Sequence, residues 1–574
     1  MIPAAAGRNP CRMRDIDKKT YEGNTGLRMA LRQGGECDSR DMKWIRKPDT
    51  ETRKKFGKAA AVAATLLAGL LVFYRHWQFE LPFYPNVDEQ LSLDCIYNLL
   101  NQHLYAGDIY VLDFFRYPHF TFYYAVLGVR ILGRFISGVD TVVLIRYVVC
   151  GTALLSNVFV YFVIKMMTGS RRWAYIGLVL SVFSLYGYAY LYYTGPDTMI
   201  YAVANVILFL GCLIYKDSQA DRVVYLWYPL LAVCIGLATA AKYHGILFGL
   251  FWLALHISKK YWKSYRNNFL FFLNCILIVL VFCLCNYSMF FYFRTFVGDN
   301  MYNFNHYAWG HPGIEHNLPI LGYLEAYGLT SYGVLGGILL LFGIWKLAHR
   351  KDWRQIGVFL ILPVFVILFL SKYQIVLGRN LSLILPFAYL FMVYGLMETE
   401  AVLEKRRFYR KGMITAVLAL MVAGNVETAF NDYRYDLTYT EAVEYIESEI
   451  PAGASIYCTS FAPGIDEERY TVIDIGEDLS LLPKTLGEGE YFVDVEYATG
   501  YFKQPKDYLI REGEDMYPEL RAAYEEKEAA FPLKQSYPGI SYGREWKYRI
   551  GYADIFKYDP GEYYIGPTIT IYGE

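Results

Sequence analysis

Long apolar segments, each about 16 to 27 residues, recur between residues 59 and 427, separated by short polar stretches. A helix needs about 20 apolar residues to cross a hydrocarbon core roughly 30 Å thick, so this pattern predicts membrane-spanning helices. We predict eleven spans, at residues 59–76, 141–167, 173–193, 197–215, 223–241, 243–258, 269–292, 323–345, 356–371, 381–397 and 412–427.

A twelfth apolar stretch, residues 119–136, carries Arg130 and Arg134 at helical spacing. A helix with one cationic face suits the membrane interface better than the lipid interior. The loops test this interpretation, because Lys and Arg gather on the cytoplasmic side of membrane proteins. If the stretch does not span, five basic loops share one side with the basic N-terminal segment: 169–173, 216–222, 258–266, 346–354 and 404–411. This arrangement predicts a cytoplasmic N-terminus.

The same sidedness places residues 77–140, residues 293–322 and the whole chain after residue 427 on the non-cytoplasmic face. Composition agrees with a membrane protein that has soluble parts, since 55% of the 574 residues are hydrophobic and 19% are charged. A typical soluble protein is about 25% charged. Residues 1–58 hold 15 Lys or Arg against 8 Asp or Glu and show no apolar periodicity, which predicts a disordered cytoplasmic head.

The chain after residue 427 has a different character. From residue 430 it holds 13 Lys or Arg against 29 Asp or Glu, so the chain is acidic where it is predicted to be exported. The helical spacing of TEAVEYIESEI is followed by strand patterns at ASIYCTSF, RYTVIDI, EYFVDVEYATGYF, ADIFKY and YYIGPTITIY. We therefore predict three parts: the head 1–58, a transmembrane domain 59–427 and a soluble α/β or α+β domain 428–574.

Two adjacent carboxylates, Asp88 and Glu89, follow the first span and precede the helical pattern QLSLDCIYNLLNQHLY. Acids at a helix N-terminus cap the helix and complement its dipole, which is one explanation of the pair. In the other explanation, one carboxylate removes a proton from an acceptor hydroxyl while its neighbour tunes the pKa or holds a divalent cation.

Other candidate residues also lie at predicted outer ends of spans. Asp197 follows Pro196 in TGPDTM, a common helix start. Lys242 and Arg379 have two explanations: they snorkel to the interface, or they bind a lipid-linked phosphate as a pair of cations. The aromatic stretch RYPHFTFYY, residues 116–124, is typical of an interfacial belt.

Three histidines recur at five-residue steps in the outer loop 293–322, but their spacing matches no closed zinc pattern, so no metal ligand is assigned. They are His306, His311 and His316.

Five motifs occur in a fixed order: DE (Asp88, Glu89), YPH (residues 117–119), GPD (195–197), GLATAAKYHG (236–245) and GRNLSLILPF (378–387). In this order they resemble the polyprenyl-phosphate-sugar-dependent glycosyltransferases of the GT-C superfold, in particular the family 39 protein mannosyltransferase and RgtA/B/C/D-like group. The resemblance covers roughly residues 59–400. The sequence departs from it at YPHF, where many relatives have HPP, and at RNL, where many have RY.

The resemblance implies two interfacial helices in the first outer loop and an active site at the acidic pair, with Asp88 as the base. It also implies that a sugar moves from a polyprenyl-phosphate donor to an acceptor hydroxyl on a protein, glycolipid or wall polymer. One carboxylate base and no separate nucleophile indicate inversion at the anomeric carbon. A divalent cation is possible but not required, and no nucleic acid is expected as a partner. The implied donor-binding residues are Lys242, Arg379, Asp197, Tyr243, His119 and Arg116.

Two other classes of protein are alternatives. A transporter or flippase for a lipid-linked sugar commonly shows internal repeats and ionisable residues near the middle of the membrane. The sequence shows no such repeat, and its candidate charges lie at span ends. A non-catalytic scaffold that presents the acidic C-terminal part would not need the ordered motifs of the outer loops.

Overall fold

The computed structural model describes residues 50–78, 88–102, 109–184, 191, 193–309, 318–329, 332–373, 376–405, 410–429, 436–459, 462–476, 479–496, 516–540 and 564–574. Most of the predicted head, residues 1–49, lies outside these residues, and so does the strand expected at ADIFKY.

Each predicted span overlaps a helix. These helices are α1 (Thr50–Trp77), α4 (Thr141–Thr168), α5 (Arg171–Val182), α7 (Pro196–Lys216), α9 (Tyr228–Ala241), α10 (Phe248–Ser258), α11 (Tyr265–Cys285), α14 (Gly333–His349), α15 (Trp353–Leu370), α16 (Leu385–Lys405) and α17 (Arg410–Ala429). Short helical segments join or extend them: α8 (Ala220–Arg222), η1 (Val223–Trp227), η2 (Tyr243–Leu247), η3 (Tyr261–Lys263), η4 (Tyr287–Phe290) and η5 (Gly378–Leu381). Helix α5, however, ends at Val182, within the span predicted at 173–193, and α14 begins only at Gly333, within the span predicted at 323–345.

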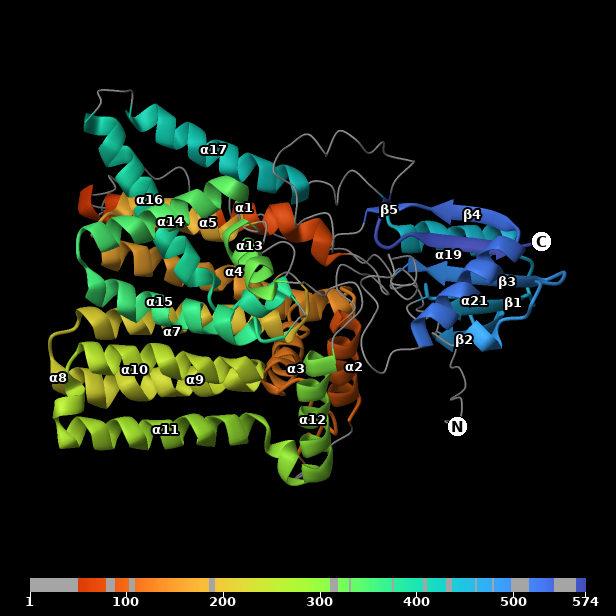
Figure 1. Ribbon diagram of the computed structural model, residues 1–574, viewed down its shortest axis with the longest axis horizontal. Coiled ribbons are helices and arrows are strands. Elements are labelled where there is room, and N and C mark those ends of the chain that lie inside the picture. The colour runs from red at the N-terminus through yellow and green to blue at the C-terminus, as the bar shows by residue number, and fades with distance from the viewer. Residues whose placement is uncertain are drawn as a thin grey trace, which may run out of the picture. The chain divides into compact units, whose positions relative to one another are not determined.

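Five of the described helical stretches are long and apolar enough to cross a membrane by length and composition. They are Thr141–Thr168, Pro196–Lys216, Ala220–Ala241, Tyr265–Cys285 and Trp353–Leu370. Figure 1 shows α7, α9, α10, α11 and α15 running alongside one another. The membrane-protein class is therefore confirmed, while the total of eleven spans stays a prediction.

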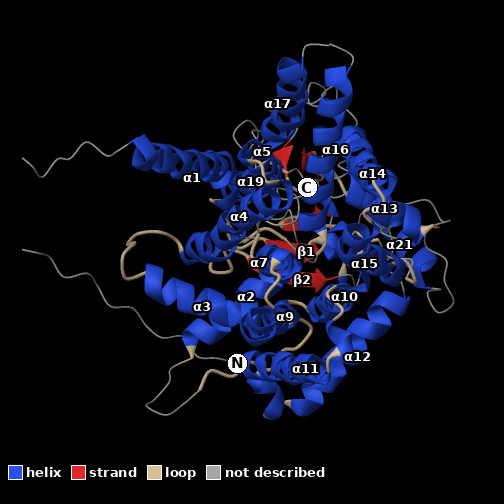
Figure 2. Cartoon of the chain, turned by 90° about the vertical axis from the view of Figure 1, so that its left-hand side faces the viewer, coloured by secondary structure: helices blue, strands red, loops and turns tan. Residues whose placement is uncertain are grey.

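Three further helices lie in the predicted outer loops: α2 (Asp88–Asn101), α3 (Phe120–Leu132) and α12 (Phe293–Trp309). A fourth, α13 (Pro319–Leu329), includes residues 323–329, where the span at 323–345 was predicted to begin. With 13 residues, α3 is about 20 Å long, and it carries Arg130 in its last turn. Figures 1 and 2 show α2, α3 and α12 running across the direction of the long helices. The two helices expected in the first outer loop are thus present.

Two glycines bring α14 and α16 into backbone contact. A β-carbon on Gly343 would lie 2.1 Å from the carbonyl oxygen of Phe391, and one on Gly395 would lie 2.0 Å from that of Leu339. Small residues at such crossings let helices pack closely in a membrane, where van der Waals contact drives association. This close contact fixes the position of α16 against α14. Helix α16 begins four residues after the end of η5.

The C-terminal region forms a five-stranded sheet with strand order β2-β1-β3-β7-β4. Its elements are α19 (Thr438–Glu449), β1 (Ser455–Thr459), β2 (Thr471–Gly476), η6 (Leu479–Leu481), β3 (Glu490–Val495), α21 (Met516–Ala530), β4 (Leu533–Tyr537) and β7 (Ile569–Gly573). A two-stranded sheet pairs β5 (Gly539–Ile540) with β6 (Tyr564–Ile565). Strand β1 pairs in parallel with β2 and β3, whereas β7 pairs antiparallel with β3 and β4.

Alternate side chains of this sheet enter two separate cores. Val493 and Ile571, which are paired in register, pack on one face with Ile446 of α19. Phe492 and Tyr572 pack on the other face with Tyr524 of α21. The period of two along a strand therefore builds an α/β layer structure with a helix on each face. This confirms the predicted class of the C-terminal domain.

Strand β4 was not predicted from the sequence. Its residues, LKQSY, lack an apolar alternation, and its first two positions are exposed at the edge of the sheet. An edge strand has one neighbour and tolerates polar residues, so its sequence carries a weak strand signal.

Candidate active site

Glu89 is buried, with 1% of its side chain exposed, and its carboxylate accepts three strong hydrogen bonds. Arg146 of α4 donates from Nε to Oε1 over 2.9 Å and from Nη2 to Oε2 over 2.8 Å. The backbone N–H of Thr194 donates to Oε1 over 2.8 Å. The carboxylate therefore joins α2, α4 and the segment that leads into α7.

The two charges of this pair depend on each other. The guanidinium of Arg146 is also buried, with 1% of its side chain exposed, and Nη1 donates to the carbonyl oxygen of Trp77 over 3.4 Å. A bidentate pair with further hydrogen bonds is the geometry that offsets the cost of removing two charges from water. Because Asp88 is the first residue of α2, the pair also fixes the backbone that carries Asp88. The side chain of Asp88 lies outside the described residues.

A second polar cluster surrounds Lys242. Its ammonium donates to Oδ1 of Asp197 over 2.6 Å and to Oδ1 of Asn380 over 2.8 Å. Asp197 stands in the first turn of α7 and accepts from the hydroxyl of Tyr193 over 3.4 Å. Lys242 directly follows the last residue of α9 and has an extended backbone, so its side chain does not continue the helix. The motifs GPD, AKYHG and GRN thus meet at one place.

The Lys242 cluster has capacity for a ligand. An ammonium group has three N–H donors, and two of those on Lys242 are used by Asp197 and Asn380, so one is left. Arg379, next to Asn380 in η5, is partly exposed, and its carbonyl oxygen accepts from the hydroxyl of Ser382 over 2.5 Å. The structure therefore places Lys242 beside the start of α7, with Arg379 next in sequence to its partner Asn380.

Tyr243 links Lys242 to the first outer loop. Its hydroxyl donates to the carbonyl oxygen of Phe115 over 2.8 Å and accepts from Nδ2 of Asn300 in α12 over 3.3 Å. The neighbouring Arg116 is exposed, and its guanidinium lies 4.1 Å from the ring centre of Tyr302, also in α12. Tyr243 and Arg116 consequently tie the loop to α12.

His119 forms hydrogen bonds inside the same loop and to Asn286. It is fully buried, its Nε2 lies 2.6 Å from the carbonyl oxygen of Phe114, and its backbone N–H donates to Asn286 over 2.9 Å. A carbonyl only accepts, so Nε2 carries the proton of the neutral ring. Burial lowers the pKa of His119 to about 4, despite the opposing effect of the hydrogen bond to Phe114. At neutral pH the imidazole is therefore uncharged.

Contacts run continuously through the predicted site. Glu89 accepts a hydrogen bond from the backbone N–H of Thr194, which lies three residues before Asp197. Asp197 accepts one from the ammonium of Lys242, and the hydroxyl of the next residue, Tyr243, donates to the carbonyl oxygen of Phe115. Six of the eight residues named from the sequence make side-chain contacts within this region: Glu89, Asp197, Lys242, Tyr243, His119 and Arg116.

Sequence reasoning missed two residues of this network. Arg146 lies inside the apolar run TVVLIRYVVC, and a lone charge in a predicted span is a recognised sign of a buried partner. Asn380 supplies the second acceptor for Lys242, yet no sequence pattern links two residues 138 positions apart.

Within the described part of the chain, no group of three or more His, Cys, Asp or Glu residues is arranged to hold a metal ion. His311, His316 and the side chain of His306 lie outside that part.

No protein-family model matches the sequence, and no curated protein sequence matches it. Among solved structures, ArnT from Cupriavidus metallidurans in the apo state is similar, with a TM-score of 0.50 and 13% identity over 79% of this chain and 95% of ArnT. ArnT bound to undecaprenyl phosphate matches over the same shares with a TM-score of 0.47 and 13% identity.

The archaeal oligosaccharyltransferase AglB from Archaeoglobus fulgidus, in complex with an inhibitory peptide and a dolichol-phosphate, matches with a TM-score of 0.44 and 10% identity. That match covers 70% of this chain and 62% of AglB. The likeness to apo ArnT shows that the chain has a GT-C fold, as the five motifs predict.

Replacing Arg146 with Ala should destabilise the protein strongly, because the Glu89 carboxylate would stay buried without its partner. The expected loss is about 3–5 kcal/mol in the free energy of unfolding. The control is Arg172→Ala, which removes an ion pair with Glu400 whose arginine is 42% exposed, and should cost less than about 1 kcal/mol. Thermal unfolding in detergent compares the two, and equal small shifts would contradict the role of Arg146.

Acid should weaken the fold through His119. Its folded pKa of about 4 lies below the ordinary value of 6.5, so the unfolded chain binds more protons between these values. The contribution is fully present above about pH 6.5 and falls by about 3 kcal/mol as the pH approaches 4. The melting temperature of His119→Gln should fall less over this range than that of the wild type or of a variant at the exposed His349, His349→Gln. Identical pH profiles would exclude His119 as the cause.

Proposed function

We propose that this chain is an integral-membrane glycosyltransferase that moves a sugar, with inversion, from a polyprenyl-phosphate donor to an acceptor hydroxyl on the non-cytoplasmic face. The observation that carries the proposal is the convergence of the DE, GPD, AKYHG and GRN motifs in one connected polar network. The GT-C fold supports it, and ArnT, which shares that fold, has been crystallised with undecaprenyl phosphate.

The two residues of the acidic pair have different proposed roles, one in orientation and one in proton transfer. Glu89 already accepts from Arg146 and Thr194, so it serves to orient the start of α2. Asp88 then acts as the general base and takes the proton of the acceptor hydroxyl. The hydroxyl oxygen attacks the anomeric carbon, and the bond from that carbon to the phosphate oxygen breaks with its electrons leaving on the phosphate.

The leaving phosphate is stabilised by the cations at the start of α7. Negative charge grows on it as the bond breaks, so fixed cations bind the transition state more tightly than the ground state. Lys242 offers its remaining N–H donor, and Asp197 and Asn380 hold that ammonium in position. Arg379 offers a planar fork of donors suited to phosphate oxygens.

The proposed sidedness rests on the basic loops. Their Lys and Arg residues share one side with the N-terminus, which makes that side cytoplasmic and exports the outer loops and the C-terminal domain. The candidate charges then lie at outer helix ends, where a lipid-linked phosphate resides, and not at mid-membrane as in a transporter.

The proposal predicts a large effect of Asp88→Asn. Asn keeps the size and the capping oxygen of Asp but lacks its basic carboxylate, so turnover should fall by about 10²–10⁴. The matched control is Asp140→Asn, because Asp140 caps α4 through the backbone N–H of Val142 over 2.7 Å and Asn caps about equally well.

The assay follows the polyprenyl phosphate released when purified protein is given a polyprenyl-phosphate sugar and membranes as the source of acceptor. Asp140→Asn should keep its activity. Near wild-type turnover of Asp88→Asn would reduce the acidic pair to a structural role, and no release by the wild type with any such donor would contradict the proposed function.

A further inference from the structure

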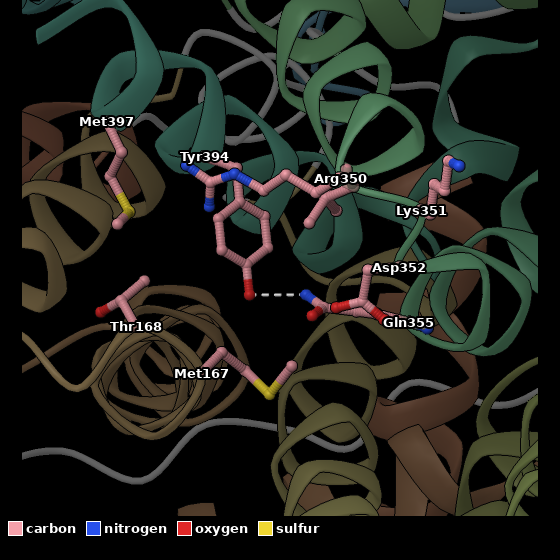
Figure 3. A pocket seen from close by; sticks show the side chains of 9 residues that line it. Met167, Thr168, Arg350, Lys351, Asp352, Gln355, Tyr394 and Met397 are labelled. Atoms are coloured by element: carbon pink, nitrogen blue, oxygen red, sulfur yellow. Dashed lines mark hydrogen bonds between the residues drawn. The ribbon is translucent and has the colours of Figure 1, made fainter. Parts of the chain in front are cut away.

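A polar cavity of about 540 Å³ lies away from the candidate active site. Figure 3 shows the side chains around it, with the hydroxyl of Tyr394 pointing toward Gln355 and with Met167 and Met397 nearby. Arg350 and Lys351, from the turn between α14 and α15, are the cationic residues of its lining.

Helix geometry separates this cavity from the network around Lys242. Tyr394 and Met397 lie nine and twelve residues after Leu385, about 14–18 Å along α16, whereas Asn380 precedes that helix. Met167 is next to the last residue of α4, about 31 Å along the axis from Arg146 near its start. The cavity therefore lies apart from the candidate active site.

The charges around the cavity favour an anion. Glu398 is shared by two cations, since Arg350 donates to Oε1 and the ammonium of Lys346 lies 3.1 Å from Oε2. Lys351 adds a third, exposed cation. Asp352 is occupied at the start of α15, where it accepts from the backbone N–H of Gln355 over 3.2 Å. Among the residues that line the cavity, Arg350 and Lys351 are cations and Asp352 is a carboxylate, so two cations face one carboxylate.

The remaining lining combines hydrogen-bonding and apolar groups. Nε2 of Gln355, which is 8% exposed, donates to the hydroxyl of Tyr394 over 2.6 Å, so this hydroxyl keeps its own proton to donate. Met167 and Met397 supply flexible apolar surface beside these groups. An inorganic anion has no apolar atoms to contact this surface, whereas a lipid carries apolar carbons next to its phosphate.

We propose that this cavity binds the phosphate-bearing headgroup of an anionic phospholipid. Arg350 and Lys351 face the phosphate, Tyr394 donates to a headgroup oxygen, and Met167 and Met397 contact the glycerol and first acyl carbons. Basic pockets between membrane helices are suited to anionic headgroups, because each Lys or Arg near the membrane surface contributes about 1 kcal/mol. The site is independent of the proposed transferase reaction.

Native mass spectrometry of the purified protein, with phosphatidylglycerol or phosphatidylcholine added, tests the proposal. The wild type should retain phosphatidylglycerol preferentially. Lys351→Gln should weaken that retention about fivefold and Arg350→Gln about tenfold, as the loss of one cation and of one charge-assisted hydrogen bond predict. In Arg350→Gln, Lys346 still pairs with Glu398.

The matched control is Lys260→Gln. Lys260 has the same left-handed backbone as Lys351, with φ of 60° against 57°, and stands in another basic turn. It does not line the cavity, so retention should be unchanged. Equal weakening by Lys260→Gln would mean that general surface charge holds the lipid, and unchanged retention in both Lys351→Gln and Arg350→Gln would exclude the cavity.

A separate arm distinguishes a lipid from a free anion. Inorganic phosphate is added to the same protein and thermal stability is measured. Stabilisation by phosphate that both cavity variants abolish, without selective retention of phosphatidylglycerol, would overturn the lipid assignment. Selective retention of phosphatidylglycerol that millimolar phosphate does not displace would support it.

Discussion

The buried ion pair between Glu89 and Arg146 is the interaction on which the candidate site depends. Neither charge reaches bulk water, so each is stable only while the other is in place. Two parallel hydrogen bonds and a third from the backbone of Thr194 fix three segments that are distant in sequence. Any arrangement of α2, α4 and the approach to α7 that broke this pair would leave a bare charge in an apolar interior.

The pair also links the residues to which the two catalytic tasks are proposed to belong. The residue before Glu89 is the proposed base, and the segment that Thr194 begins leads directly to Asp197. Asp197 in turn positions the ammonium of Lys242, which faces the proposed phosphate. The proposed base and the proposed phosphate-binding cation are therefore linked by short lengths of backbone and one carboxylate, which suits a reaction that develops charge at both ends.

Hydropathy and charge predicted much of the fold because they act locally. A span is visible in about 20 consecutive residues, and the arginines of residues 119–136 together with the basic loops predict that this stretch does not span. Strands β3 and β7 were predicted from the same kind of local pattern. Edge strand β4 escaped prediction because its polar residues carry no alternation.

Site partners could not be predicted in the same way. Arg146 and Glu89 are 57 residues apart, and Lys242 and Asn380 are 138 apart, so their pairing exists only after the helices have packed. The sequence supplied the residue types and the order of the motifs, while helix packing decided that Glu89 would be held by an arginine and that Lys242 would be shared between two acceptors.

The central claim is that the carboxylate pair and the phosphate-facing cations form one connected unit. The most direct test is a double-mutant cycle on the binding of polyprenyl phosphate to purified protein, with Glu89→Gln, Lys242→Gln and the two together. Connection through residues 194–197 predicts that the double variant loses less than the sum of the single losses, by about 1 kcal/mol or more. Losses that add to within about 0.5 kcal/mol would show that the two clusters act independently and would contradict the account.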